Sequence, residues 1–255
     1  FVSVPADCNR ARGRNQGVAQ AAYDTVLFLD SDLEISPSLL YRHLESYENQ
    51  RIAAVMGEVF LPKFVKKSRW FRFLDSDYRS TRRWAAQART SQSPPLRYVN
   101  TSNFSVRKAV YKQCQGHAEH IDHPEAEDID LAYRINAQDL GGIHFEPEAL
   151  AYCMYPPLKT SLFSKFQFGR EGIPKLLELY PELYPVLSSR FVSMPNFSRV
   201  SPVYCFFMNL LFTPPVRFVA RGLRLLGPEF VSYRMMRYML QYESVRGVKQ
   251  SLREG

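Results

Sequence analysis

The apolar positions of the first sixty residues predict alternating strands and helices. Residues 26–29 form a continuous apolar run, as strands buried on both faces of a parallel sheet do, and residues 52–60 form a second strand candidate. Residues 18–22 are rich in alanine, which indicates a helix, and residues 39–48 have helical periodicity. Residues 1–4 resemble a strand already under way. This alternation predicts an α/β fold.

The pattern changes in the last sixty residues. Residues 203–212 are nearly all apolar, and a Thr-Pro-Pro break at residues 213–215 ends the run. Arg217, Arg221 and Arg224 then share one helical face, with apolar side chains on the others. Basic amphipathic helices of this kind suit a membrane interface, and packing on the preceding domain is the alternative.

These patterns divide the chain. We predict an α/β domain over residues 1–195 and an amphipathic helical extension over residues 196–255. No segment reaches the ~20 consecutive apolar residues that a membrane-spanning helix needs.

The predicted strand at residues 26–29 ends abruptly in Asp30-Ser31-Asp32. Carboxylates just past the carboxyl end of a strand lie where open α/β sheets bind ligands. Mg²⁺ and Mn²⁺ prefer oxygen ligands, often one or two carboxylates completed by substrate phosphates. Ser36-Pro37 then resembles a helix start. The segment predicts a strand, a metal-binding loop and a helix, unless the two aspartates only cap a turn.

Two further charged segments are candidates for chemistry. Arg10, Arg12 and Arg14 stand where the first helix begins, and arginines and helix N-termini both favour phosphate, although a solvated basic loop is the alternative. Residues 127–130 form an acidic run that opens a later helix, where backbone dipoles keep a carboxylate ionised. Such a carboxylate can act as a general base toward a hydroxyl group, unless the run only caps the helix.

Together these motifs resemble family 2 glycosyltransferases with the GT-A fold. The resemblance rests on Gly13-Arg14-Asn15-Gln16-Gly17, on Asp30-Ser31-Asp32, and on residues 127–134, which match Glu-Asp-x-Asp-Leu-x-x-Arg. It implies a Rossmann-like, mixed but mostly parallel sheet flanked by helices. It also implies a nucleobase-binding strand upstream of Phe1, so we expect an N-terminal portion to be missing.

The family implies transfer of a sugar from a UDP-, GDP- or dTDP-sugar to a hydroxyl acceptor, a saccharide or a lipid-linked saccharide. By resemblance, Asp128 is the base of an inverting reaction and Glu127 supports it. The same resemblance implies that Asp30 and Asp32 bind Mg²⁺ or Mn²⁺ at the donor diphosphate. Where many relatives carry a histidine ligand this chain has none, which leaves Cys153 or water as a third ligand.

Other roles follow from the same resemblance. Besides the two aspartates, the resemblance suggests Arg14, Asn15 and Arg170 as residues that bind the donor diphosphate. It suggests Asn103, His117 and Gln167 as residues that bind the acceptor. The family's Gly-Gly-Phe-Asp-Glu element is replaced here by residues 115–119, Gln-Gly-His-Ala-Glu, which hides the identity of the acceptor. Gln167 and Arg170 fit the Gln-x-x-Arg-Trp element of processive synthases, but Glu171 replaces the tryptophan and favours single additions.

Three features are interpreted as structural. Asp75 and Asp77 repeat the Phe-Leu-Asp-Ser-Asp letters of the first motif among alternating charges, so we expect them to pair with arginines on a helix surface. Asp130 is expected to pair with Arg134 one helical turn later. The evenly spaced histidines, His117, His120 and His123, are interpreted as surface or acceptor-contacting residues rather than a metal site.

Composition narrows the class of partner. The net charge is +8, which suits a polyanion, a phosphorylated small molecule or an anionic membrane surface. Arginines and aromatic residues mix between residues 66 and 89, but no nucleic-acid-binding signature accompanies them, so we expect no nucleic acid partner. The four cysteines form no CxxC pair, which favours a reducing, cytoplasmic location, including the inner face of the membrane.

The sequence therefore predicts a metal-dependent, inverting and non-processive glycosyltransferase. Two alternatives stay open. One is a metal-dependent phosphohydrolase that uses the same carboxylates, and the other is a non-catalytic relative that binds a nucleotide or a glycan.

Overall fold

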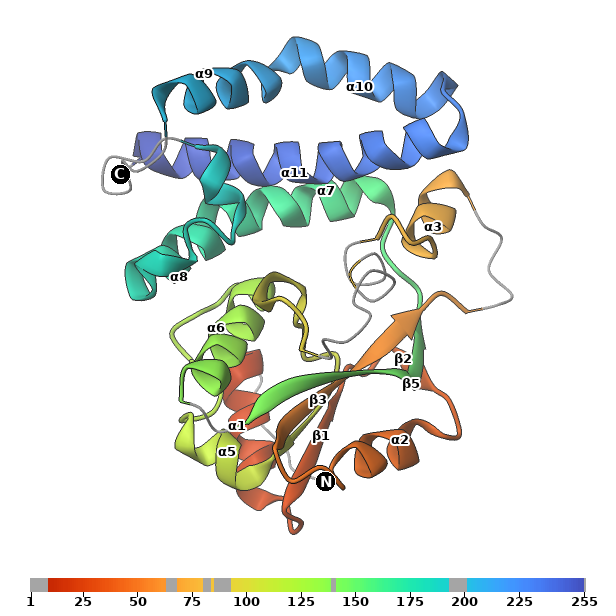
Figure 1. Ribbon diagram of the computed structural model, residues 1–255, viewed down its shortest axis with the longest axis vertical. Coiled ribbons are helices and arrows are strands. Elements are labelled where there is room, and N and C mark those ends of the chain that lie inside the picture. The colour runs from red at the N-terminus through yellow and green to blue at the C-terminus, as the bar shows by residue number, and fades with distance from the viewer. Residues whose placement is uncertain are drawn as a thin grey trace. The chain divides into compact units, whose positions relative to one another are not determined.

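The chain forms two compact units in the computed structural model (Figure 1). Unit 1 comprises residues 1–65 and 83–154, and unit 2 comprises residues 66–82 and 155–255. The division after residue 154 precedes the boundary predicted at residue 195. Within these units the structure describes residues 9–62, 68–79, 84, 93–138, 141–192 and 201–254, so the strand predicted at residues 1–4 lies outside the described residues.

A mixed sheet is the centre of unit 1. Its strands lie in the order β1-β4-β3-β5-β2, with bounds β1 (Thr25–Leu29), β2 (Leu33–Ile35), β3 (Ile52–Phe60), β4 (Asn103–Arg107) and β5 (Gly142–Cys153). Among the described strands β3 and β5 are parallel and the other three pairs are antiparallel. The mixed α/β fold is as predicted, but the described part of the sheet is not mostly parallel.

Helices cover both faces of this sheet (Figure 1). One face carries α1 (Arg10–Gln20), α5 (Lys108–Gln113) and α6 (Pro124–Ala137), and the other carries α2 (Leu39–Ser46); a 3-10 turn, η1 (Leu96–Tyr98), precedes β4. The core lies under α1, α5 and α6, where Phe104 and Val106 of β4 are fully buried. β3 is buried along nearly its whole length, as a central strand should be.

Three local predictions differ from the structure. β1 pairs only with β4 among the described strands and has one buried residue, Phe28, so its apolar run does not mark a strand buried on both faces. Helix α1 starts at Arg10, because the Asn9 side chain accepts a hydrogen bond from the Arg12 amide and caps it. The arginines are therefore helical. Strand β2 follows the acidic loop, and α2 starts only after Ser38.

Unit 2 is helical and is built around its longest helix, α11 (Glu229–Glu254). The others are α3 (Arg69–Leu74), α7 (Leu158–Gln167), the π-helical turn η2 (Phe168–Gly172), α8 (Ile173–Leu179), η3 (Pro181–Leu183), η4 (Ser188–Phe191), α9 (Pro202–Leu211) and α10 (Pro214–Leu226). Among the described helices, none is both long enough and apolar enough to span a bilayer.

Two glycines allow α11 to approach its neighbours closely. A Cβ on Gly169 of η2 would collide with the Ser244 carbonyl of α11, and one on Gly247 would collide with the Phe166 carbonyl of α7. The second Phe-Leu-Asp-Ser-Asp segment also lies in this unit. Asp75 caps the C-terminal end of α3 and Asp77 follows in a turn, so neither lies on a helix surface as predicted.

Candidate active site

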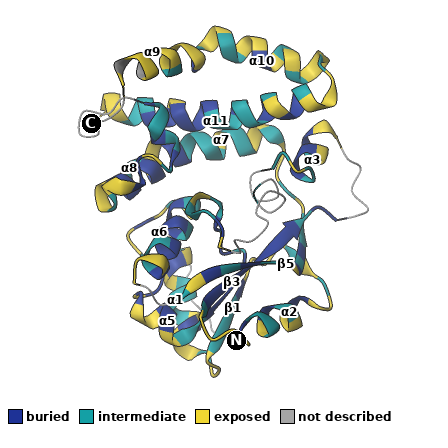
Figure 2. Ribbon diagram, in the orientation of Figure 1, coloured by how far each residue is buried: buried dark blue, intermediate teal, exposed yellow. Residues whose placement is uncertain are grey.

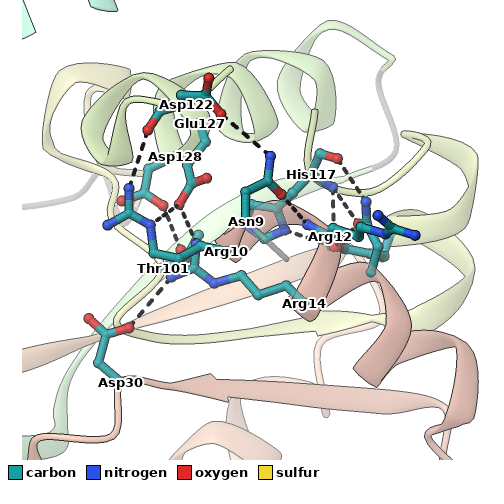
Figure 3. Close-up of polar contacts among 12 residues, drawn as sticks. Asn9, Arg10, Arg12, Arg14, Asp30, Thr101, His117, Asp122, Glu127 and Asp128 are labelled. Atoms are coloured by element: carbon teal, nitrogen blue, oxygen red, sulfur yellow. Dashed lines mark hydrogen bonds and ion pairs between the residues drawn. The ribbon is translucent and has the colours of Figure 1, made fainter. Parts of the chain in front are cut away.

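The pairing of β1 with β4 positions the first aspartate of the acidic loop. The antiparallel register sets Leu29 opposite Asn103, and the Asp30 amide donates to the Ser102 carbonyl at 3.0 Å. Asp30 therefore lies beside the polar segment that leads into β4. Figure 3 shows Thr101 of that segment between Asp30 and helix α6.

Asp128 lies on the second turn of α6 and faces this segment. The Thr101 hydroxyl donates to Asp128 Oδ1 at 2.5 Å. Burial raises the pKa of Asp128 to about 7, although the Thr101 hydrogen bond and the nearby Arg14 favour the ionised form. The Thr101 backbone amide also donates to this carboxylate. A carboxylate titrating near neutral pH is suited to proton transfer.

Arg14 joins the two acidic motifs (Figure 3). Its Nη1 donates to Glu127 Oε1 at 2.6 Å, and its Nη2 lies 3.5 Å from Asp30 Oδ1. Arg10 approaches Glu127 from the same helix, at 3.5 Å. Glu127 is buried, and this burial raises its pKa against the attraction of the two arginines. Residues far apart in the sequence thus form one charged cluster.

The second loop aspartate lies beside β5. Strand β2 pairs with β5 so that Leu33 is opposite Cys153, and the Cys153 thiol donates to Asp32 Oδ2 at 3.5 Å. Asp30 and Asp32 are both exposed. Among the described residues no group of three or more His, Cys, Asp or Glu side chains could hold a metal ion. The carboxylates therefore fit a hard divalent cation only if a substrate, such as a diphosphate, supplies further oxygen ligands.

Asn15 has a different environment from the one predicted for a diphosphate ligand. Its Nδ2 donates to the His117 carbonyl at 3.0 Å, and its Oδ1 accepts from the His117 amide at 2.9 Å. The Tyr111 hydroxyl also donates to Oδ1, at 2.6 Å. Gly116 has φ 67° and passes against the Asn15 side chain. Asn15 thus holds the loop before α6 on helix α1.

His117 and Asn103, both predicted at the acceptor, are buried. His117 is 1% exposed, its Nδ1 lies 2.7 Å from the Tyr111 hydroxyl, and burial lowers its pKa to about 3. Asn103 is fully buried on the α2 side of β4, where its Nδ2 donates to the Ala149 carbonyl at 2.8 Å and its Oδ1 contacts His43 Nε2 at 2.9 Å. Both side chains are hydrogen-bonded within the protein in this structure, and their assignment to the acceptor stays a prediction.

The remaining predicted residues lie elsewhere. Gln167 ends α7, and Arg170 lies on η2, where its Nε forms an exposed ion pair with Glu254 at 3.1 Å. Both belong to unit 2. In unit 1, Asp130 and Arg134 form the predicted ion pair. His117, His120 and His123 form no metal cluster with each other among the described residues.

Sequence reasoning missed Thr101, whose hydroxyl contacts Asp128, and the anchoring role of Asn9. The Asn9 Nδ2 donates to the Glu119 carbonyl at 2.8 Å, next to the Asn15 contacts. Thr101 lies in a run of four consecutive small polar residues, residues 100–103. This polar run indicates a functional segment in the sequence, but only the structure shows that the Thr101 hydroxyl contacts the Asp128 carboxylate.

The mixed sheet with flanking helices is that of the GT-A fold. Residues 7–114 match the model of the family described as glycosyl transferase family 2. The match covers 108 of the 255 residues, so the chain resembles this family over less than half of its length. The matched segment contains Arg14, Asp30, Asp32 and Thr101 and ends before α6. No curated protein sequence matches the chain.

Among the solved structures, one with a TM-score above 0.5 supports the fold. The mannosyltransferase PcManGT from Pyrobaculum calidifontis, in complex with GDP-Man and Mn²⁺, is 14% identical with a TM-score of 0.54, over 95% of this chain and 67% of that one. S. aureus TarS residues 1–349 in complex with UDP are 15% identical with a TM-score of 0.43, over 97% of this chain and 72% of that one.

Proposed function

We propose that the chain transfers one sugar at a time from a nucleoside diphosphate sugar to a hydroxyl acceptor, with inversion and with a divalent metal. The observation that supports this most directly is the Thr101–Asp128 contact beside the Arg14 cluster. Asp128 supplies a carboxylate that titrates near neutral pH, and Arg14 supplies a cationic group able to bind phosphate.

Asp128 is the general base in this proposal. Its carboxylate takes the proton of the acceptor hydroxyl as the acceptor oxygen bonds to the anomeric carbon. The bond from that carbon to the diphosphate oxygen breaks in the same displacement, and the electron pair leaves with the nucleoside diphosphate. One displacement from the opposite face inverts the anomeric centre. The Thr101 hydroxyl holds Oδ1 and orients the carboxylate.

The donor diphosphate binds at the acidic loop. Asp30 and Asp32 would hold Mg²⁺ or Mn²⁺, which supplies positive charge to the departing diphosphate. Arg14 carries a second positive charge next to Asp30 and orients the phosphates. The Mn²⁺ and GDP-Man of PcManGT are consistent with this chemistry.

The donor is a UDP-, GDP- or dTDP-sugar and the acceptor a saccharide or lipid-linked saccharide. Glu171, in the position of the processive enzymes' tryptophan, favours single additions. Cys114 and Cys153 are free thiols, which suits a cytoplasmic location.

Nucleotide-induced thermal shifts test the proposal. We expect one of UDP, GDP or dTDP to stabilise the chain only when Mn²⁺ is present, and Asp32→Ala to abolish that shift. Asp128→Asn should keep the shift and lose transfer. Asp77→Ala is the matched control, because Asp77 is the equivalent aspartate of the other Phe-Leu-Asp-Ser-Asp segment. This substitution should change neither the thermal shift nor the transfer.

Each contrary result is specific. An equal shift in wild type and Asp32→Ala would reject the metal assignment. Nucleotide-sugar hydrolysis that does not depend on an acceptor would favour a phosphohydrolase. Retained function in Asp128→Asn would favour a non-catalytic binding protein.

A further inference from the structure

Helices α9 and α10 carry apolar side chains that the other described residues of unit 2 leave exposed. We call this surface the α9–α10 face and define it by Phe206, Phe207, Leu210, Phe218, Val219 and Leu226. Figure 2 shows both helices as mostly exposed, in contrast to α11. Phe218 is 78% exposed and Leu226 is 89% exposed. Contiguous apolar surfaces of this kind mark an interaction site on a folded protein.

Helix α10 is oriented opposite to an ordinary surface helix. Its side toward α11 carries Arg217, Ala220 and Arg224, while its apolar side chains point away. Arg217 Nη2 lies 2.6 Å from Glu243 of α11, and its guanidinium lies 5.3 Å from the centroid of the Tyr242 ring. A helix on a soluble protein normally buries its apolar stripe against the core. The outward apolar side of α10 therefore needs another partner.

Polar contacts fix this orientation. Arg69 of α3 donates to the Leu225 carbonyl at 2.9 Å and to the Gly227 carbonyl at 3.2 Å. The Ser232 hydroxyl donates to the Arg224 carbonyl at 2.8 Å. These bonds satisfy carbonyl groups at the C-terminal end of α10, which otherwise lack partners. The apolar side is thus held outward by contacts within unit 2.

We propose that the α9–α10 face docks onto an anionic lipid surface, with both helices lying in the plane of the membrane interface. A break at Phe212 and Thr213 separates helices of 10 and 13 residues. Helices this short extend ~15 to ~20 Å, less than the ~30 Å hydrocarbon core, so they suit the interface rather than a span. Apolar burial in the headgroup region is the usual binding mode of such helices.

Charge selects an anionic surface. Residues 201–228 contain three arginines and no lysine, aspartate or glutamate. Arg221 is exposed on α10 and lies at the border between the arginine side of this helix and its apolar side, one turn before the exposed Leu225, so its long side chain can extend to lipid headgroups.

Co-flotation of the full chain with vesicles tests the proposal. Wild type should float with vesicles containing about a third phosphatidylglycerol and much less with phosphatidylcholine alone. Phe218→Ser/Leu226→Ser should lower the partition coefficient by about tenfold or more, because two exposed anchors are lost. Arg221→Glu should lower it by about fivefold and reduce its salt dependence. Tyr23→Ser/Leu44→Ser is the control, since both residues are more than 60% exposed in unit 1.

The proposal would be overturned if wild type did not float with anionic vesicles, or if the Phe218→Ser/Leu226→Ser variant floated as well as wild type. It would also be overturned if light scattering showed that wild type is a dimer and that this variant is a monomer. The substitutions replace exposed side chains and should leave the fold intact, which circular dichroism checks. The metal-dependent nucleotide shift should be unchanged in every variant, so this proposal can fail independently of the proposed transferase chemistry.

Discussion

Asp128 combines two opposing influences on one carboxyl group. Burial raises its pKa to about 7, while the Thr101 hydroxyl lowers it by donating to the ionised form. A base must be ionised to accept a proton. The proposed sugar transfer should therefore depend on pH in the neutral range, and Thr101 should set where the change occurs.

We predict that kcat/KM of wild type falls about tenfold per pH unit below about pH 7, as one group becomes protonated. Thr101→Val should move this limb to higher pH, because the hydrogen bond that favours the carboxylate is lost. Ser102→Ala is the control, since the Ser102 hydroxyl donates to Asn100 and not to Asp128. A pH profile identical in wild type and Thr101→Val would contradict the assignment.

Asn15 offers a test between a structural role and a donor-binding role. Asn15→Ala removes the side-chain partner of the His117 carbonyl and one of the two partners of the His117 amide, which keeps the Tyr111 hydroxyl, so we predict a loss of ~1–3 kcal/mol in the free energy of unfolding. Nucleotide affinity should change little. Urea unfolding and nucleotide titration measure the two effects, with Gln16→Ala as the control. Unchanged stability with weakened nucleotide binding would restore the donor-side role.

At the scale of single residues, the sequence predicted the segments that form the candidate site. It was less successful at predicting which side chains in those segments face the site. Asp30, Arg14, Glu127 and Asp128 lie in motifs with distinctive charge spacing, and the structure brings them together. Asn103 lies in a similarly polar segment but faces α2. The face of the sheet to which a side chain points depends on the register of its strand and on the alternation of side chains along it. The run of polar residues before β4 indicated neither of these.

Among the elements, β1 illustrates why a short apolar run is ambiguous. The run was typical of a strand buried on both faces, yet β1 has one described neighbour and one buried residue. Periodicity over so few residues cannot distinguish an edge strand from a central one. The longer apolar run of β3 agreed with the structure at both ends, Ile52 and Phe60. For α10, the sequence predicted an amphipathic helix, but only its contacts decide which side faces α11.

The packing of α11 on α7 gives an element-scale prediction. Gly247→Ala places a Cβ against the Phe166 carbonyl, so the helices must separate, and we predict a loss of about 1–3 kcal/mol in the free energy of unfolding. Gly222→Ala in α10 has no neighbouring atom within 4 Å and should instead stabilise the helix by roughly 0.5–1 kcal/mol. Chemical denaturation measures both. A neutral Gly247→Ala would mean that the helices do not pack this closely.

At the scale of the whole molecule, two buried ionisable groups in unit 1 have opposite effects on the free energy of unfolding as the pH falls. Burial lowers the pKa of His117 to about 3, so the unfolded chain binds a proton below about pH 6.5 that the folded chain does not. Acid therefore destabilises the fold through His117. Asp128 acts in the opposite direction, because its folded pKa of about 7 exceeds the ordinary aspartate pKa of 3.8.

This opposition leads to a measurable difference between wild type and Asp128→Asn. The Asp128 contribution is full below about pH 4 and is lost as the pH rises through about 7. We predict that wild type gains stability relative to Asp128→Asn by about 1.4 kcal/mol per pH unit as the pH falls from about 7 to about 4. Urea unfolding of both proteins across this range measures the difference, and the contribution of His117 cancels because both proteins contain it. A constant difference would show that Asp128 titrates at an ordinary pKa in the folded chain, which would also remove the physical basis for its role as a base tuned to neutral pH.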